Sequence, residues 1–165
     1  MNKADTFTLL RRKHYFISRR DILELNYNIK AELDTSGGEV EPVWSDMGKT
    51  MTNLSMSLNE VLVQFSYLSD NGWGSSEVTG GQFTVTFTGH KVEGDPVSEF
   101  ILGKDVEYKF GGARKTKMRL VRGTNAIVWD VTLANITEGG GDAQQPNAIT
   151  LTVHGNGAPQ FETVS

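Results

Sequence analysis

The stretch of residues 79–103 constrains the fold more than any other part of this chain, because an alternating strand runs directly into a short helix. Phe83, Val85 and Phe87 alternate with polar residues, most of them threonine. A period of two is the pattern of a strand that is buried on one face and exposed on the other. The sequence therefore predicts a half-buried strand over residues 82–88.

The helix after this strand has a start signal of its own. Asp95 is placed to accept backbone hydrogen bonds as the N-cap, and Pro96 suits the first helical position because its missing N–H is not needed there. We expect Gly103 to end the helix in the left-handed conformation. About two turns are too short to be stable alone, so the helix must pack on a sheet. Its packing stripe is Val97, Phe100 and Ile101.

Alternating patterns recur along the rest of the chain and indicate further short strands. The chain has 18 glycines and 4 prolines, a composition typical of many strands joined by tight turns. Residues 59–68 could also form a helix, but the alternation favours a strand. The expected fold is an all-β antiparallel sandwich or barrel of about seven or eight strands with one short flanking helix. The other expected strands cover residues 51–58, 61–68, 106–110, 115–122, 126–136 and 148–154.

We expect three regions along the chain. Residues 1–43 lack clean periodicity and are predicted to form an N-terminal arm or extended hairpin. Residues 44–160 contain the regular alternation and form the sandwich domain. Residues 161–165 form a short C-terminal tail after the glycine-containing turn that ends the last expected strand. The sequence shows neither an internal repeat nor a boundary between two folded domains.

No set of residues in the sequence predicts catalysis or a cofactor. The absence of cysteine excludes disulfides and thiolate metal sites. The three histidines are far apart in sequence, and the glycine clusters lack the lysine and helix of a phosphate-binding loop. We therefore expect a protein that is not an enzyme and holds neither a metal nor a cofactor. Pairs of acids could serve catalysis or cation binding, but solvated strand faces or capping explain them better: Glu39 with Glu41, Glu93 with Asp95, and Asp105 with Glu107.

Charge is distributed in blocks, although the net charge is only −4. Residues 1–20 and 109–122 are basic, whereas residues 21–60 are acidic. Such blocks could set the register between copies of the protein, or they could be solvated faces that happen to cluster. The candidate inter-subunit charges are Arg11, Arg12, Lys13, Arg19, Arg20, Glu39, Glu41, Lys115, Lys117 and Arg119.

Membrane insertion and secretion find no support in the sequence. No apolar run approaches the roughly 20 residues of a membrane span. The N-terminal region lacks the apolar core of a signal peptide, because Arg19, Arg20 and Asp21 interrupt it. We expect the protein to be made in the cytoplasm of the cell that produces it, with no membrane partner.

The order of several motifs resembles the major tail proteins of long-tailed phages with non-contractile tails. The likeness spans roughly residues 44–160, whereas the residues before 44 depart from the pattern. It rests on the motifs VTGGQ at 78–82, TGHKVEGDP at 88–96 followed by Phe100 and Ile101, and YLSDNG at 67–72. Trp44 and the ending HGNGAP at 154–159 extend it.

The resemblance implies a tail-tube fold and a structural function. Six copies would join their sheets into a ring whose inner wall is a continuous barrel, and the rings would stack into a tube in the virion tail. Implied partners are other copies, a tape-measure protein inside the tube, the tail terminator and distal tail proteins. DNA would pass through a polar or acidic lumen without specific binding. The alternative is a sandwich module that binds carbohydrate or a receptor, for which Trp73 is the best candidate platform.

Overall fold

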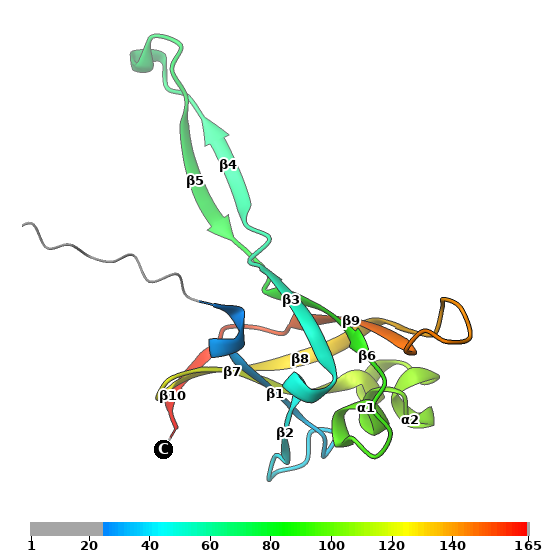
Figure 1. The fold of residues 1–165 in the computed structure, drawn as a ribbon. Helices are drawn as coiled ribbons and strands as arrows, with labels where there is room; N and C mark the ends of the chain where they lie inside the picture. Colours follow the sequence, from blue (N-terminus) through cyan, green and yellow to red (C-terminus); the bar gives the residue numbers. More distant parts are fainter. Residues whose placement is uncertain (1–24, 165) are drawn as a thin grey trace, which may run out of the picture.

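The computed structural model describes residues 25–164 and shows an all-β fold with two short helices (Figure 1). Its main sheet has eight antiparallel strands in the order β2-β1-β7-β8-β9-β6-β3, with β10 pairing to β8. A second sheet of two strands, β4 and β5, stands apart from it. The strands are β1 (Lys30–Asp34), β2 (Trp44–Asp46), β3 (Met51–Ser57), β4 (Val61–Phe65), β5 (Ser75–Gly80), β6 (Thr84–His90), β7 (Lys115–Arg122), β8 (Asn125–Glu138), β9 (Ala148–Gly155) and β10 (Gln160–Thr163).

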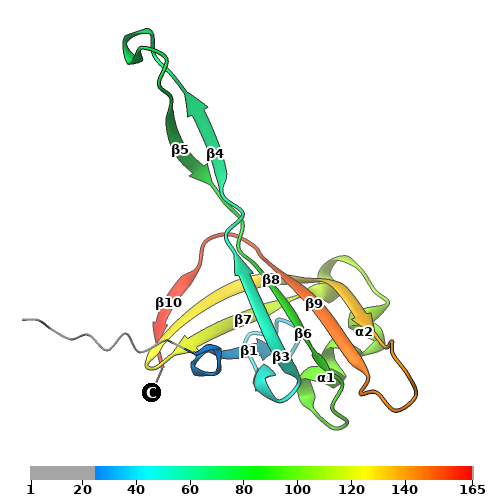
Figure 2. The same ribbon diagram turned by 45° about the horizontal axis from the view of Figure 1, so that its top comes forward.

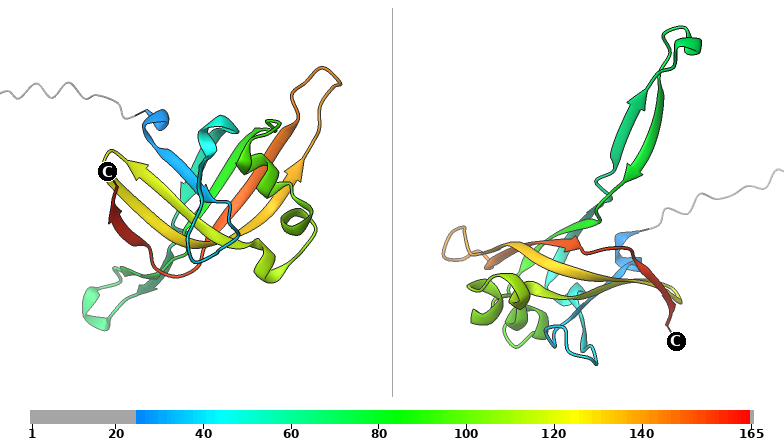
Figure 3. Two further views of the ribbon diagram at one scale, coloured as in Figure 1. Left: turned by 90° about the horizontal axis from the view of Figure 1, so that it is seen from below. Right: turned by 180° about the vertical axis from the view of Figure 1, so that it is seen from behind.

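The helical elements are short and lie at the ends of strands. The α-helices are α1 (Pro96–Ile101) and α2 (Lys104–Glu107). The 3-10 helices are η1 (Asn26–Asn28), η2 (Met47–Lys49), η3 (Leu68–Asp70) and η4 (Gly111–Arg114). In Figure 3, α1 and α2 lie side by side at one side of the main sheet.

The main sheet is strongly curved, and its inner face holds the core. β2 and β3 stand at opposite ends of the strand order, yet only η2 and Thr50 separate them in sequence, so the two edges must approach each other. One buried apolar cluster joins strand residues with residues of both helices, including Val97, Ile101 and Val106. The expected half-buried strand is β6, in which Val85 and Phe87 are buried while Thr86 and Thr88 are exposed.

β8 pairs with three other strands of the main sheet: β7, β9 and β10. Along one edge it pairs with β7 in a hairpin, whose inward residues include Met118 and whose outward residues include Lys117. Along its other edge it pairs first with β10 and further on with β9. Residues 156–159 separate β9 from β10, so the two behave as one interrupted strand. The sequence reproduces the bounds of β7 and predicts most of β8 and β9.

The β4–β5 hairpin projects away from the body of the molecule (Figures 1 and 2). It begins directly after β3 and returns to β6, so the chain leaves the main sheet and re-enters it at neighbouring strands. The strand interpretation of residues 61–68 is confirmed for Val61–Phe65, and the helix alternative is wrong. Asn71 and Gly72 both have positive φ at the tip, as the turn motif predicts.

The strand expected at residues 106–110 is wrong. Residues Lys104–Glu107 form α2, and Val106 enters the core while Tyr108 and Phe110 are exposed. The Arg114 side chain replaces a neighbouring strand as hydrogen-bond donor, because it binds the carbonyl oxygens of Val106, Glu107 and Lys109 at 3.1, 2.7 and 2.8 Å. Val106, Tyr108 and Phe110 are spaced two residues apart as on one strand face, but only Val106 is buried.

Gly103 does not adopt the left-handed conformation that we expected. Its φ is −66° and its ψ is 143°, and it begins α2 instead of closing α1, whose C-cap is Leu102. Glycine is needed for space, because a Cβ at this position would lie 2.9 Å from the carbonyl oxygen of Glu99. The close approach of the two helices thus explains this glycine.

Two strands lie in the regions that we assigned to an arm and a tail. β1 pairs with β7 and β2, and residues 31–34 of β1 are buried. β10 pairs with residues Asn125–Val128 of β8, although we predicted no strand in that region. Both regions therefore contribute strands to the main sheet, while the division into three regions stays a prediction.

Candidate assembly surfaces

The projecting hairpin carries many exposed apolar side chains. Every residue of β4 and β5 is exposed, and so are the residues of the tip apart from Asp70. Trp73 is 82% exposed. A two-stranded hairpin is marginally stable on its own in water, and apolar surface of this kind marks a site of interaction. The apolar residues are Val61, Leu62, Val63, Phe65, Tyr67, Leu68, Trp73 and Val78.

The composition of β4 gives a second reason to expect that a partner covers the hairpin. Val61, Leu62 and Val63 are consecutive, so they point to both faces of the ribbon. Strands that are apolar on both faces are typical of strands covered on both sides. Within residues 25–164 no segment covers either face of the hairpin, so both faces are available to a partner. This run was the signal in the sequence that could have identified the hairpin as an assembly element.

An apolar hollow of about 410 Å³ lies near the base of the hairpin. Within the main sheet, the rings of Phe83 and Trp129 stack with centroids 3.9 Å apart and planes 3° from parallel. Gly155 has no side chain to disturb this stack, since a Cβ there would lie 3.2 Å from Phe83. The stack therefore holds the segment that returns from the hairpin to β6 against β8. The hollow is lined by Met56, Ser57, Leu58, Phe83, Leu120, Arg122, Asn125, Ile127 and Trp129.

A buried polar clamp fixes α1 to the start of β3. One carboxylate oxygen of Asp95, Oδ1, accepts hydrogen bonds from the backbone N–H groups of Val97 and Ser98, both at 3.1 Å. The same oxygen accepts the hydroxyl of Thr50 at 2.7 Å. Pro96 occupies the first turn, and Val97 and Ile101 are buried, whereas Phe100 is half-buried. The N-cap thus serves both the helix and its attachment to the sheet.

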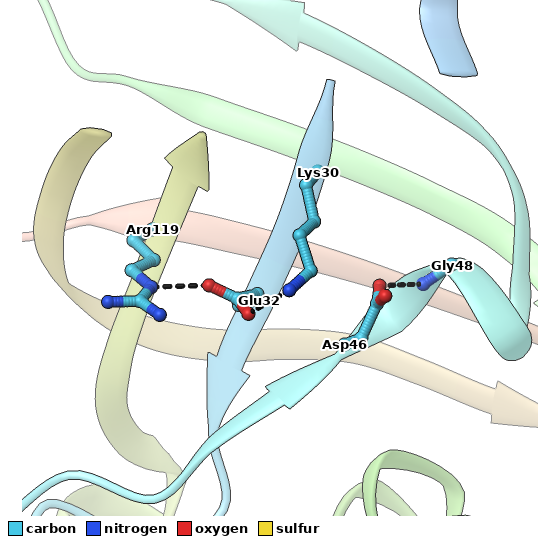
Figure 4. A network of polar contacts seen from close by, with 5 residues as sticks. All are labelled: Lys30, Glu32, Asp46, Gly48 and Arg119. Atoms are coloured by element: carbon cyan, nitrogen blue, oxygen red, sulfur yellow. Dashed lines mark hydrogen bonds and ion pairs between the residues drawn. The ribbon is translucent and has the colours of Figure 1, made fainter. Parts of the chain in front are cut away.

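An ionic cluster joins β1 to β7 and orders the outer face of that sheet region (Figure 4). Glu32 is 4% exposed and pairs with Arg119 on β7 through Oε2 and with Lys30 through Oε1, the latter at 2.7 Å. The Arg119 guanidinium also lies 4.6 Å from the ring centroid of Trp44. Nearby, Asp46 accepts the backbone N–H of Gly48 at 2.8 Å and begins η2.

The pKa of Glu32 reflects two opposing causes. Burial disfavours its carboxylate and by itself would raise the pKa, but the hydrogen bonds from Arg119 and Lys30, together with their positive charges, lower it below the ordinary value. The same interaction raises the pKa of Lys30, chiefly through its hydrogen bond to Glu32. Glu32 is therefore ionised and Lys30 protonated at neutral pH.

The predicted inter-subunit charges are distributed over separate parts of the molecule. Glu39 and Glu41 are exposed in the connection between β1 and β2, and Lys115 and Lys117 lie on the outward face of β7. Arg119 is engaged within the chain, as described above. Their roles toward neighbouring subunits stay predictions. Arg11, Arg12, Lys13, Arg19 and Arg20 lie outside the described residues.

No group of three or more His, Cys, Asp or Glu side chains within residues 25–164 is arranged to hold a metal ion. Among the helices of that same segment, none has the length and apolar character needed to cross a membrane.

Comparison with known proteins shows likeness in structure but not in sequence. No protein-family model and no curated protein sequence matches this chain. A chain in the tail of an empty gene transfer agent particle, refined with C6 symmetry, superposes with a TM-score of 0.63 at 14% identity, covering 85% of this chain and 99% of that one. A chain of the anti-feeding prophage tube-terminating cap gives 0.55 at 13% identity, covering 90% and 99%.

A chain of the anti-feeding prophage baseplate gives a TM-score of 0.57 at 11% identity, covering 87% of this chain and 97% of that one. At such identities the likeness establishes the fold alone, which is an all-β, tail-tube-like fold. These neighbours come from the tail of a gene transfer agent particle and from the tube-terminating cap and the baseplate of an anti-feeding prophage. They include a gene transfer agent and an anti-feeding prophage, so the likeness in fold does not single out phages with non-contractile tails.

Proposed function

We propose that this chain is the subunit of a tail tube, in which copies form rings, six to a ring, and the rings stack into a conduit for DNA. The observation that carries the proposal is the projecting hairpin, which exposes apolar side chains on both faces. It stands on a fold shared with a component of a C6-symmetric tail. Burial of this hairpin against another copy supplies the driving force for assembly.

A hairpin that inserts into a different region of a second copy makes a heterologous contact. Such contacts close into rings when the rotation permits and otherwise continue as open assemblies. A tube needs both outcomes, closure within a ring and continuation between rings. The charge blocks, including Glu39, Glu41, Lys115 and Lys117, would then exclude wrong registers.

The remaining features of the proposal follow from the resemblance in sequence. The tube would belong to the tail of a virion, with subunits made in the host cytoplasm and a long, non-contractile tail as its setting. Its partners would be further copies, a tape-measure protein inside the tube, and the terminator and distal tail proteins at its ends. DNA would pass through without specific binding, and the subunit would not be an enzyme.

Gel filtration and negative-stain electron microscopy of the purified protein test the proposal. We expect rings or tubes of uniform width. Replacing Trp73 at the hairpin tip with serine should raise the concentration needed for assembly at least about tenfold, which corresponds to about 1.4 kcal/mol of lost contact energy. The unfolding midpoint of the monomer should hardly change, because Trp73 is 82% exposed.

The matched control is Tyr108→Ser, which removes an aromatic ring that is 72% exposed but lies outside the hairpin. It should assemble at close to the native concentration. A chain that stays monomeric at all concentrations and binds glycan through Trp73 would refute the tube and favour the binding module instead.

A further inference from the structure

The chain contains two Asn-Gly pairs, and both lie in exposed turns. Asn71-Gly72 lies at the tip of the projecting hairpin, and Asn156-Gly157 lies in the connection between β9 and β10. The two pairs have the same covalent chemistry. Any difference in their reactivity must therefore come from the structure around each asparagine.

At the hairpin tip, the groups that could react with each other are unpaired. The N–H of Trp73 donates to the carbonyl oxygen of Asp70 at 3.0 Å and closes the turn. Asn71 and Gly72 are the central residues of this turn, and a Cβ at Gly72 would meet nothing within 4 Å. Within residues 25–164, neither the Asn71 side chain nor the Gly72 N–H makes a hydrogen bond.

Asn156 is held at two points. Its backbone N–H donates to the carbonyl oxygen of Asp130 at 2.7 Å, and its side-chain Nδ2 donates to the hydroxyl of Thr132 at 2.9 Å. A reaction of this side-chain amide must first break the hydrogen bond to Thr132. Asn156-Gly157 is thus an internal control for the pair at the hairpin tip.

We propose that Asn71 is a site of spontaneous covalent modification, at which the free subunit loses the side-chain amide through a succinimide. The backbone nitrogen of Gly72 attacks Cγ of Asn71, the N–Cγ bond forms, the Cγ–Nδ2 bond breaks, and the proton of the Gly72 N–H leaves with Nδ2 as ammonia. Water then opens the succinimide ring at one of its two carbonyls, which gives aspartate or isoaspartate at position 71. The reaction needs no reactant other than water.

The conformation of the turn controls the rate of this reaction. Asn71 has φ 51° and ψ 37°, and this ψ holds the Gly72 nitrogen on the far side of the Cα–C bond from Cβ, away from Cγ. Asn71 must therefore leave the left-handed conformation before the ring can form, and the turn has a single hydrogen bond to resist that change. An exposed loop tip opens at little cost, and glycine places no side chain in the way.

Loss of the amide changes the hairpin tip in two ways. It adds a negative charge next to Asp70, whose carboxylate already accepts the N–H of Tyr67 at 2.8 Å. Isoaspartate also lengthens the backbone by one methylene group within a two-residue turn, and the turn fixes the register of the two strands. Both changes lie beside Trp73.

The effect on assembly rests on the proposed function, in which a second copy covers the hairpin. A neighbouring subunit that packs on the tip holds the turn closed and stops the reaction. Free subunits therefore lose the ability to assemble as they age, whereas subunits already in a tube keep the native asparagine.

Peptide mass spectrometry tests the modification by itself, on native protein incubated at neutral pH and at a concentration where gel filtration shows monomer. The peptide that contains residue 71 should gain the mass difference between an amide and a carboxylic acid, and part of the product should be a substrate for an isoaspartate methyltransferase. The same change at Asn156 should be at least about tenfold slower, which corresponds to about 1.4 kcal/mol of activation free energy. No change at residue 71, or equal rates at the two sites, would overturn the inference.

The effect on assembly is tested with Asn71→Gly as the matched control, because glycine accepts the positive φ and has no amide to lose. After the same incubation, the native chain should lose assembly in step with the modification, and Asn71→Gly should keep it. In tubes, modification of Asn71 should be at least about tenfold slower than in monomer. A modified native chain that assembles as well as fresh protein would overturn the effect on assembly and leave the tube standing. If fresh native protein forms no ring or tube, the proposed function fails, and the monomer measurement still decides the modification.

Discussion

Removing the carboxylate of Asp95 should destabilise the subunit more than the loss of a helix cap alone. Replacement of an N-cap aspartate by alanine costs about 1 kcal/mol. In this structure the same oxygen also accepts the hydroxyl of Thr50, which is only 2% exposed. Leaving a buried donor without its acceptor costs about 1–3 kcal/mol more. We therefore expect Asp95→Ala to reduce the free energy of unfolding by about 3 kcal/mol.

Urea unfolding followed by tryptophan fluorescence measures this loss, at a protein concentration where gel filtration shows monomer. For a chain of this length the expected change corresponds to a fall in Tm of about 6–12 °C. Asp95→Asn is the matched control, because asparagine is as good an N-cap and keeps an acceptor for the two backbone N–H groups. It should cost less than about 1 kcal/mol.

A double-mutant cycle with Thr50→Val identifies the shared hydrogen bond. Because both substitutions remove that bond, their combined cost should fall short of the sum of the single costs by about 1 kcal/mol. The reasoning is refuted if Asp95→Ala costs no more than Asp95→Asn, or if the two losses simply add.

Two further predictions concern the sheet. In a urea titration, Gly89→Ala should cost at least about 3 kcal/mol of unfolding free energy or prevent folding, because a Cβ at Gly89 would lie 2.1 Å from the carbonyl oxygen of Thr50. The control Gly80→Ala, whose Cβ would meet nothing within 4 Å, should change stability by less than about 0.5 kcal/mol. Similar costs for both substitutions would contradict the steric argument. Because the pKa of Glu32 is lowered in the folded chain, its ion pairs contribute stability in full above the ordinary glutamate value of about 4.3 and lose it as the pH falls through the lowered pKa. Glu32→Gln should therefore cost about 2 kcal/mol at pH 7, and its difference from the native chain should narrow below about pH 4; a difference independent of pH would contradict the assignment.

Local signals in the sequence were sufficient where a residue's role is decided by its neighbours in the chain. The N-cap at Asp95 depends on the backbone N–H groups two and three residues later, and the alternation over β7 depends on one buried face. The all-β class followed from many such strands. These inferences needed no knowledge of distant partners.

The errors came where a distant contact decided the structure. Val106 and Tyr108 have the spacing of one strand face, but the Arg114 side chain satisfies the carbonyls of that segment and allows a helical turn. Gly103 is required by the approach of the preceding helix turn. β10 has too few residues to show a period, and it forms because β8 offers it an edge.

The assembly surfaces were difficult to predict for a different reason. Alternation in residues 61–68 is equally compatible with a strand on the main sheet and a strand in a projecting ribbon. Only the consecutive apolar residues Val61, Leu62 and Val63 distinguished the two.

The isolated hairpin has a consequence for the kinetics of polymerisation. Holding a residue in one backbone conformation costs about 1–2 kcal/mol, and in a free subunit few contacts offset that cost along the hairpin. A collision between two free subunits would bury only part of the hairpin, whereas the end of a preformed tube would offer the complete surface that covers it. Growth should therefore begin after a lag, which short tube fragments added as seeds should abolish. A subunit of this shape can stay dispersed until a template is present.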